Sequence, residues 1–93
     1  MLQALLALVD FERNQTICRI FDGDLKARRI ISDLEVILQQ MITPGKTLLF
    51  FDEIQACPRA ITALRYFYEE MPEMHVVAAG SLLEFALDES SFP

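Results

Sequence analysis

Apolar residues in this chain gather in three short runs, at residues 5–11, 48–51 and 76–79. Runs of this length between turn residues are typical of strands buried in an α/β protein. In residues 5–11 a helix is the close competitor, because leucine and alanine favour helices. Residues 48–51, Leu-Leu-Phe-Phe, are uninterrupted large apolar side chains and predict a strand that is buried on both faces.

Two segments between these runs have apolar residues at intervals of three and four, the spacing of an amphipathic helix. The first segment carries Ile30, Ile31, Leu34, Ile37, Leu38 and Met41. Asp24 is a good N-cap for this helix, and residues 43–46, Thr-Pro-Gly-Lys, break it. The second segment carries Ile61, Leu64, Phe67, Tyr68 and Met71. Pro58 suits its first turn, and Pro72 marks its end.

The resulting order is strand, helix, strand, helix, strand, followed by a short helical stretch at residues 82–87. This alternation predicts an α/β fold in which three parallel strands are joined by right-handed crossover helices. The 93 residues, 53% of them hydrophobic, fit one small domain or a piece of a larger one.

Charge and cysteine content narrow the function classes. The formal charge of −6, from 14 acidic and 8 basic residues, gives no signature of nucleic-acid binding. Cys18 and Cys57, with His75 as the single histidine, have no metal-ligand spacing and predict neither a zinc site nor a disulfide. Residues 1–9 are apolar but lack the basic region and cleavage site of a signal peptide, and no segment is long enough to cross a bilayer. We therefore expect a cytoplasmic protein without a membrane partner.

The candidate chemistry lies where the second apolar run ends in Asp52 and Glu53. Open α/β sheets bind ligands at the carboxyl ends of their strands. There Asp52 can hold Mg²⁺ through water and Glu53 can polarise an attacking water, as in nucleotide hydrolysis. From these residues alone, an equal alternative is that Asp52 caps a turn while Glu53 is solvated.

Ser81 follows the third apolar run and brings a hydroxyl to the same predicted edge of the sheet. Taken alone it suits the N-cap of the helical stretch that follows. Gly45-Lys46-Thr47 imitates the end of a phosphate-binding loop, but Gln40 stands where that loop needs a glycine. The triplet also follows a helix and opens a strand, the reverse of the required order, so the 93 residues hold no Walker A loop.

Several motifs together closely resemble one protein family. They are residues 47–55 (TLLFFDEIQ), 57–60 (CPRA), 63–67 (ALRYF) and 79–85 (AGSLLEF). These are similar to the AAA domain of a prokaryotic family of AAA+-type ATP-binding proteins, whose Walker B motif reads DEIQ. The resemblance spans residues 11–93, including FERN at 11–14 and FDGDL at 21–25.

This resemblance implies that residues 1–93 are a partial P-loop NTPase core, an AAA+ fragment without the Walker A loop or the carboxyl-terminal domain. Asp52 then serves the Mg²⁺ of Mg-ATP, Glu53 is the catalytic base, and Ser81 is a candidate sensor. The intact protein is expected to hydrolyse ATP to ADP and phosphate, whereas the fragment alone is expected to be inactive. In such ATPases the P-loop strand lies beside the sensor strand, so residues 76–79 become an exposed edge that favours self-association.

Two other functions remain open at this stage. The chain can be a non-catalytic α/β interaction module that pairs through its exposed sheet edge. It can also be another magnesium-dependent phosphoryl enzyme, in which Asp10 or Glu12 adds a further carboxylate from the end of the first strand.

Overall fold

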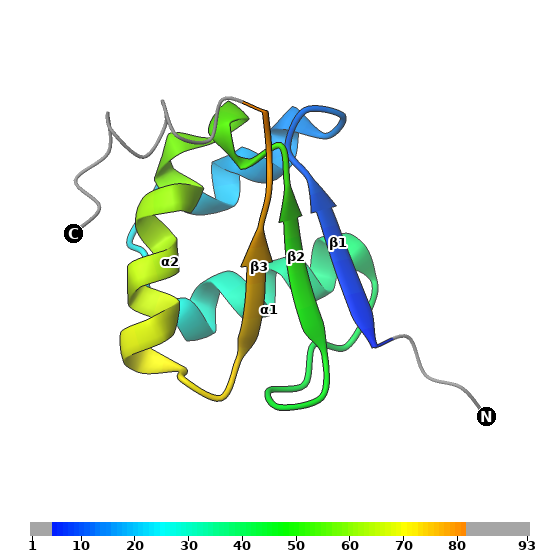
Figure 1. Ribbon diagram of the computed structural model, residues 1–93, viewed down its shortest axis with the longest axis vertical. Coiled ribbons are helices and arrows are strands. Elements are labelled where there is room, and N and C mark those ends of the chain that lie inside the picture. Colours follow the sequence, from blue (N-terminus) through cyan, green and yellow to red (C-terminus); the bar gives the residue numbers. More distant parts are fainter. Residues whose placement is uncertain (1–4, 82–93) are drawn as a thin grey trace.

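Strands and helices alternate through residues 5–81, the part of the chain that this computed structural model describes (Figure 1). The elements are β1 (Leu6–Asp10), the 3-10 helix η1 (Gln15–Phe21), α1 (Ala27–Leu38), β2 (Leu48–Asp52), the short 3-10 helix η2 (Ile54–Ala56), α2 (Pro58–Glu70) and β3 (His75–Ala78). The predicted α/β alternation is confirmed, and the first run is a strand rather than a helix. The helical stretch predicted at residues 82–87 lies outside the described residues.

The three strands form one parallel sheet in the order β1-β2-β3. Leu6 pairs with Leu48, and Leu48 pairs with His75 on the next strand. Each strand pair is joined by a crossover that contains a helix, as the right-handed connection of parallel strands requires. Within the described residues β3 is therefore an edge strand, as the sequence predicted.

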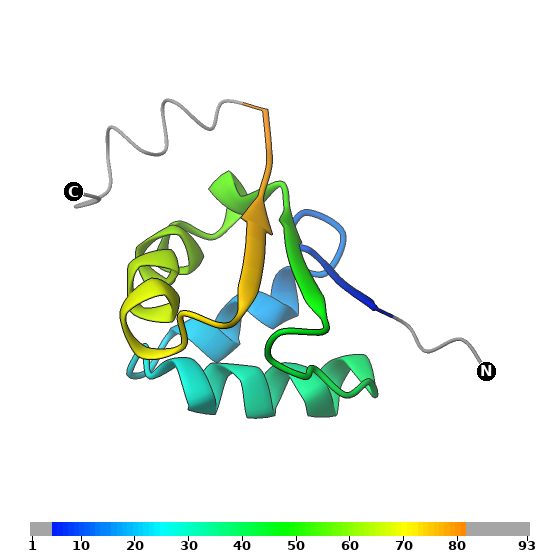
Figure 2. The same ribbon diagram turned by 60° about the horizontal axis from the view of Figure 1, so that its bottom comes forward.

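All helices of the described region pack on one face of the sheet (Figures 1 and 2). On β1 and β2 the side chains of that covered face have no exposed surface; they are Ala7, Val9, Leu49 and Phe51. The opposite, open face carries Leu6, Leu8, Leu48, Phe50 and Val77. Three of these are about half exposed, at 49% for Leu6, 51% for Leu8 and 43% for Val77. The prediction that β2 is buried on both faces is therefore wrong, because no described element covers the open face.

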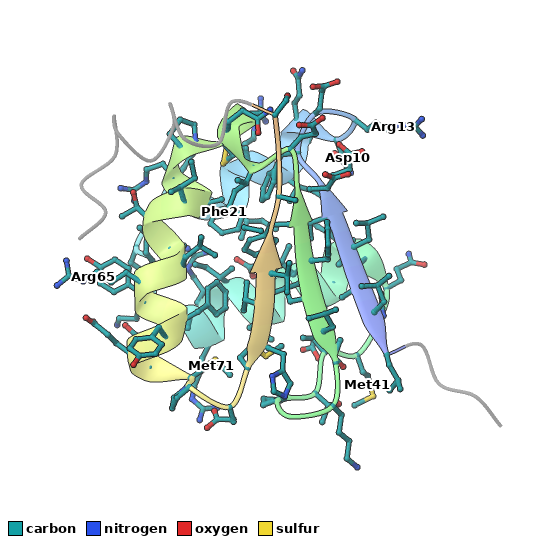
Figure 3. All side chains as sticks on the ribbon, viewed as in Figure 1. Asp10, Arg13, Phe21, Met41, Arg65 and Met71 are labelled. Carbon is teal, nitrogen blue, oxygen red and sulfur yellow. A yellow bond between two sulfur atoms is a disulfide. The ribbon has the colours of Figure 1, made fainter. Side chains whose placement is uncertain are left out.

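Four phenylalanines form the centre of the core between the sheet and the helices. Phe51 of β2 lies edge to face with Phe11, Phe21 and Phe67, with ring centroids 5.4, 5.9 and 6.1 Å away. Phe21, labelled in Figure 3, reaches this cluster from the end of η1. Edge-to-face contacts match the positive ring edge with the negative ring face, so the cluster ties η1 and α2 to the middle strand.

Helix α1 is shorter than its apolar pattern suggests. It ends at Leu38 because Gln39 adopts a left-handed backbone conformation (φ 52°) and its N–H bonds to the Glu35 carbonyl. Met41 therefore lies beyond the helix and is 78% exposed, contrary to the prediction that it belongs to the apolar face. The helix stops before residues 43–46, so the Thr-Pro-Gly-Lys segment shapes the loop to β2 instead.

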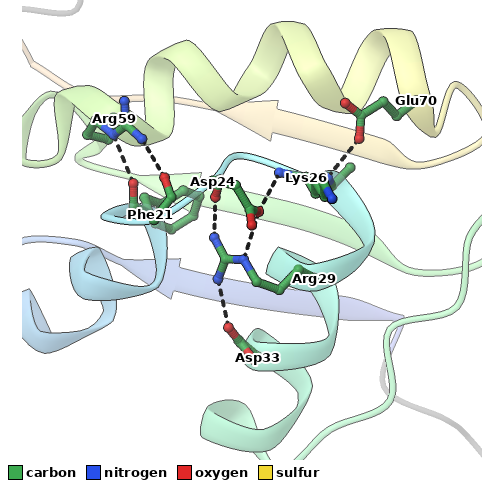
Figure 4. Close-up of polar contacts among 9 residues, drawn as sticks. Phe21, Asp24, Lys26, Arg29, Asp33, Arg59 and Glu70 are labelled. Atoms are coloured by element: carbon green, nitrogen blue, oxygen red, sulfur yellow. Dashed lines mark hydrogen bonds and ion pairs between the residues drawn. The ribbon is translucent and has the colours of Figure 1, made fainter.

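The start of α1 is capped from a distance rather than by Asp24 (Figure 4). The N-cap position is Lys26, whose side chain makes no capping bond, and the Ala27 N–H donates to Glu70 Oε1 at 2.9 Å. The predicted N-cap is thus wrong by two residues. Glu70 ends α2, so a single carboxylate links the end of one helix to the start of the other.

Asp24 instead anchors the loop before α1. Its carboxylate accepts the Lys26 N–H at 3.1 Å and the Arg29 Nε–H at 3.0 Å, and Arg29 also pairs with Asp33 (Figure 4). The Lys26 N–H and then the Arg29 guanidinium stabilise the charged carboxylate, which lowers the pKa of Asp24. Asp24 in turn raises the pKa of Arg29.

Helix α2 starts at Pro58, as predicted, and its buried side faces the sheet through Ala60, Ile61, Ala63 and Phe67. Tyr68 was assigned to this apolar side but is 80% exposed, so that assignment is wrong. Arg59 fixes the start of α2 to the loop after η1 by donating to the Phe21 and Gly23 carbonyls at 2.9 and 2.7 Å (Figure 4).

A disulfide joins Cys18 of η1 to Cys57, the residue just before α2. The sequence-based expectation of two unpaired cysteines is therefore wrong. Their Cα atoms lie 5.7 Å apart, within the usual range for a bridge, although 39 positions separate them in sequence. The sequence spacing of the two cysteines does not predict this disulfide, because the pairing depends on η1 and α2 packing side by side on the covered face.

Within residues 5–81 there is no helix with the length and apolar character that crossing a membrane requires.

Candidate functional site

Polar side chains from all three strands meet at the carboxyl edge of the sheet. The parallel register places Asp10 of β1 beside Asp52 of β2, and Glu53 and Ser81 follow the ends of β2 and β3. Asp10 is labelled at this edge in Figure 3, next to the tips of the strand arrows. The structure thus brings together the three candidate residues Asp52, Glu53 and Ser81 at the edge where α/β folds bind ligands.

Asp52 continues the alternation of β2 and therefore belongs to the open-face side of the sheet. Its Oδ1 accepts the Glu53 N–H at 3.0 Å. Its Oδ2 makes no hydrogen bond within the described residues, so one carboxylate oxygen is held while the other is available.

Glu53 has an unusual backbone for its residue type. It adopts the left-handed conformation (φ 52°, ψ 48°), which costs a non-glycine residue about 1–2 kcal/mol. Strain of this kind concentrates at functional sites. The conformation turns the chain sharply from β2 into η2 and sends the Glu53 carboxylate toward the end of β3.

Three donors converge on a single oxygen of Glu53. Its Oε1 accepts the Gln55 Nε2–H at 2.9 Å, the Ser81 N–H at 3.2 Å and the Ser81 Oγ–H at 3.5 Å. The Ile54 N–H also donates to the Ala79 carbonyl at 3.1 Å, which joins the same two segments through the backbone. Glu53 is therefore tied to the end of β3 and is not freely solvated.

Asp10 has a local task in the turn after β1. Its Oδ1 accepts the N–H groups of Glu12 and Arg13, both at 3.0 Å. Across residues 5–81, histidine, cysteine and carboxylate side chains form no group of three that can hold a metal ion. One oxygen of the Asp10 carboxylate is thus occupied by two backbone N–H groups of the turn.

The remaining candidates lie away from this edge. His75 opens β3 at the amino edge and is exposed, as expected of a surface histidine. Gly45 (φ 81°) and Lys46 belong to the loop before β2, where the Thr47 Oγ1 accepts the Thr43 N–H at 2.9 Å. The Gly45-Lys46-Thr47 triplet thus closes a turn at the amino edge of the sheet. Asp52 and Glu53 lie at the opposite, carboxyl end of β2.

Sequence reasoning missed the part that Gln55 plays at this site. Its side chain holds Glu53, and it packs against Gly80 so closely that a Cβ on Gly80 would lie 2.0 Å from the Gln55 Oε1. The only available signal was the position of Gln55 within the DEIQ motif, two residues after Glu53.

The parallel three-stranded sheet, with its crossover helices and its polar groups at the carboxyl edge, defines a partial α/β core of the P-loop NTPase type. Comparison with protein-family models gives a match to the AAA domain over residues 1–92, and the chain belongs to this family of AAA-type P-loop NTPases. Neither the curated proteins nor the solved structures contain a match to the chain.

Proposed function

We propose that residues 1–93 supply the catalytic acids of a Mg-ATP site in an AAA+-type ATPase, with the phosphate-binding loop contributed from outside these residues. Asp52 is the Walker B aspartate, Glu53 the base that activates water, and Ser81 the sensor that follows the end of the neighbouring strand. The observation that carries the proposal is the fixed Glu53 carboxylate, which a strained backbone and the Ser81 contacts hold at the carboxyl edge.

The chemistry of both acids fits these roles. Glu53 has one oxygen bound by three donors, and its Oε2 makes no hydrogen bond within the described residues. That oxygen can accept a proton from water. Family membership supports the assignment, because AAA domains are nucleotide-binding modules.

Asp52 suits Mg²⁺ bound with a nucleotide better than Mg²⁺ bound by protein alone. Mg²⁺ keeps several waters and uses one or two carboxylates together with substrate phosphates. One available oxygen on Asp52 meets that need, whereas the described residues offer no complete ligand cage. When bound, the ion neutralises charge on the phosphates during transfer.

We place the helix of the phosphate-binding unit on the open face of the sheet. Both observed crossovers run from β1 toward β3, and their right-handedness puts α1 and α2 on the covered face. A phosphate-binding strand beside β3 would be joined to β1 by a crossover that runs across the sheet in the opposite direction, from β3 toward β1. A right-handed crossover in that direction has its helix on the open face. Such a helix would cover Leu8 and Phe50 and begin near Asp52, where its N-terminus favours phosphate.

Glu53→Gln is the decisive substitution, because it keeps the shape of the side chain and removes the base. We expect a polypeptide that carries a phosphate-binding unit ahead of these residues to hydrolyse ATP. In that polypeptide Glu53→Gln should lower kcat by about 10²-fold or more while ATP still binds. Steady-state phosphate release and calorimetric ATP titration measure the two effects separately.

The 93-residue chain and a matched variant complete this test. The chain alone should bind ATP weakly and hydrolyse none, because the amides and lysine that position the phosphates are not in it. Glu73→Gln, on the loop before β3, removes the same charge and should leave kcat unchanged. Tight ATP binding by the 93 residues, or full activity of Glu53→Gln, contradicts the proposal.

The exposed edge of β3 favours a second candidate function, a module that binds a partner strand. A groove runs beside β3 and is lined by Leu64, Phe67, Tyr68, Pro72, Met74, Val76 and Ala78. A strand that pairs with β3 can place alternate side chains in this groove. In the chain alone, a second copy is the available partner, and self-association is the expected result.

Sedimentation equilibrium with two matched lysine substitutions tests this pairing. Val77→Lys, on β3, should weaken association at least tenfold, because charge on an edge strand blocks pairing. Val36→Lys also places a lysine at an exposed valine, but on α1 rather than on an edge strand, and should have little effect. A monomer at all concentrations, or equal effects of both lysines, counts against pairing through β3.

A further inference from the structure

Gln55 is the least expected part of the carboxyl-edge site. It lies in η2, two residues beyond Glu53, and its Nε2 donates to Glu53 Oε1 at 2.9 Å, the shortest of the three bonds to that oxygen. The two Ser81 contacts come from the far side, the end of β3. Glu53 Oε1 is therefore held between two separate segments of the chain.

The oxygen of the Gln55 amide, in contrast to its nitrogen, makes no hydrogen bond within the described residues. This oxygen, Oε1, is buried. An unpaired buried oxygen costs free energy. If the Gln55 amide were flipped by 180°, its oxygen would face the Glu53 carboxylate and the hydrogen bond to Glu53 would be lost. The observed orientation keeps this bond and leaves Oε1 unpaired.

Gly80 makes the close packing of Gln55 possible. A Cβ at position 80 would lie 2.0 Å from Gln55 Oε1 and 3.1 Å from Gln55 Cδ, well inside van der Waals contact. It would also lie 3.2 Å from Glu53 Cα. Any side chain at position 80 must therefore displace the Gln55 amide, whereas glycine allows the end of β3 to approach it.

We propose that Gln55 is a positioning residue for Glu53, and that Gly80 keeps the space in which it works. By holding Oε1, the Gln55 amide prevents the carboxylate from exchanging its two oxygens and leaves Oε2 as the one that accepts a proton. This role rests on the proposed function of Glu53 as the base. The hydrogen bond itself does not depend on that function and can be tested without it.

Side-chain amide exchange in the 93-residue chain, measured by NMR, tests the hydrogen bond. The Gln55 amide protons should exchange at least tenfold more slowly than those of exposed Gln15. Gly80→Ala should abolish this protection. Gly23→Ala is the matched control, because the nearest atom to its added Cβ is 4.0 Å away and its backbone is not left-handed. Gln55 exchange as fast as that of Gln15 in the unchanged chain overturns the proposal.

Hydrolysis by the polypeptide with its phosphate-binding unit tests the consequence. Gln55→Ala and the isosteric Gln55→Glu, which lacks the donor, should both lower kcat roughly tenfold or more and leave the KM for ATP within twofold. Full kcat in Gln55→Glu overturns positioning through the hydrogen bond. If Gln55→Glu is fully active while Glu53→Gln is inactive, positioning fails but the proposed function stands. If Glu53→Gln is fully active, the proposed function fails, and with it the catalytic role of Gln55, while the amide exchange still reports the bond.

Discussion

The two faces of the sheet are built from the same three strands but differ in almost every other respect. The covered face carries fully buried Phe51 in an aromatic cluster, with a disulfide and a remote helix cap in the helix layer above it. The open face carries Leu6, Leu8 and Val77, each about half exposed. These apolar side chains lie on neighbouring strands and could contact another element. The covered face is thus buried beneath the described helices, whereas the open face keeps apolar side chains in contact with solvent.

The largest expected effect contrasts neighbouring phenylalanines on opposite faces of β2. Phe51→Ala should lower the free energy of unfolding by about 3–5 kcal/mol, because it empties the centre of the core. Phe50→Ala on the half-buried open face should cost about 1 kcal/mol. Urea unfolding followed by circular dichroism measures both. Equal losses would show that the open face is also packed in solution.

Reduction of the disulfide should lower the stability of the chain. The bridge closes a long loop between Cys18 and Cys57, and its loss is expected to cost about 4 kcal/mol by the loop-entropy relation. The melting temperature should therefore fall when dithiothreitol is added. Cys57→Ala should melt at one temperature with or without the reductant, and the same insensitivity in the unchanged chain would show that the thiols are not paired.

The remote cap of α1 tests how the helix layer is held together. Glu70→Ala removes the carboxylate bound to the Ala27 N–H and should cost about 1 kcal/mol. Glu69→Ala is a matched control, since its pair with Arg65 is solvent-exposed and worth about 0.3–0.5 kcal/mol. Chemical unfolding of the two variants should separate them, and a cost for Glu69→Ala as large as that for Glu70→Ala contradicts the capping role.

Acid should remove the small contribution that Asp24, in the loop before α1, makes to the free energy of unfolding. Because folding lowers the pKa of Asp24, its contribution is present above the ordinary aspartate pKa of about 3.9 and is lost as the pH falls through the lower native value. Asp24→Asn should flatten the pH dependence of unfolding in that window. Glu12→Gln, which has no side-chain hydrogen bond in the described residues, should leave the slope as it is.

Periodicity in the sequence predicted the three strands and the two α-helices, because apolar spacing directly reflects which side of an element packs. The alternation of these elements predicted the parallel sheet, whereas the strand order was implied by the family resemblance. Sequence patterns failed where tertiary contacts overrule local preference. Glu70 caps α1 from a distant helix, although Asp24, two residues before the N-cap position, is a residue type that favours capping. The uninterrupted Leu-Leu-Phe-Phe run predicted burial on both faces, since an apolar pattern cannot say which partner covers each side.

The acidic residues of the candidate site could be predicted from the sequence, whereas the residue that holds Glu53 could not. Asp52 and Glu53 stand out because charge directly follows an apolar strand, and the edge position of Ser81 follows from parallel topology. Gln55 depends on the left-handed turn at Glu53 and on the approach of Gly80, which are three-dimensional facts without a sequence period. The Cys18–Cys57 pair escaped for the same reason.

That pair also changes the covalent topology of the molecule. The bridge closes a ring that runs from Cys18 through α1 and β2 to Cys57, so both candidate acids lie inside it. A protease that cuts the loop at residues 43–46 would open the ring without separating the pieces. The nicked chain should migrate as a single species on a denaturing gel until a reductant is added, and then appear as two fragments.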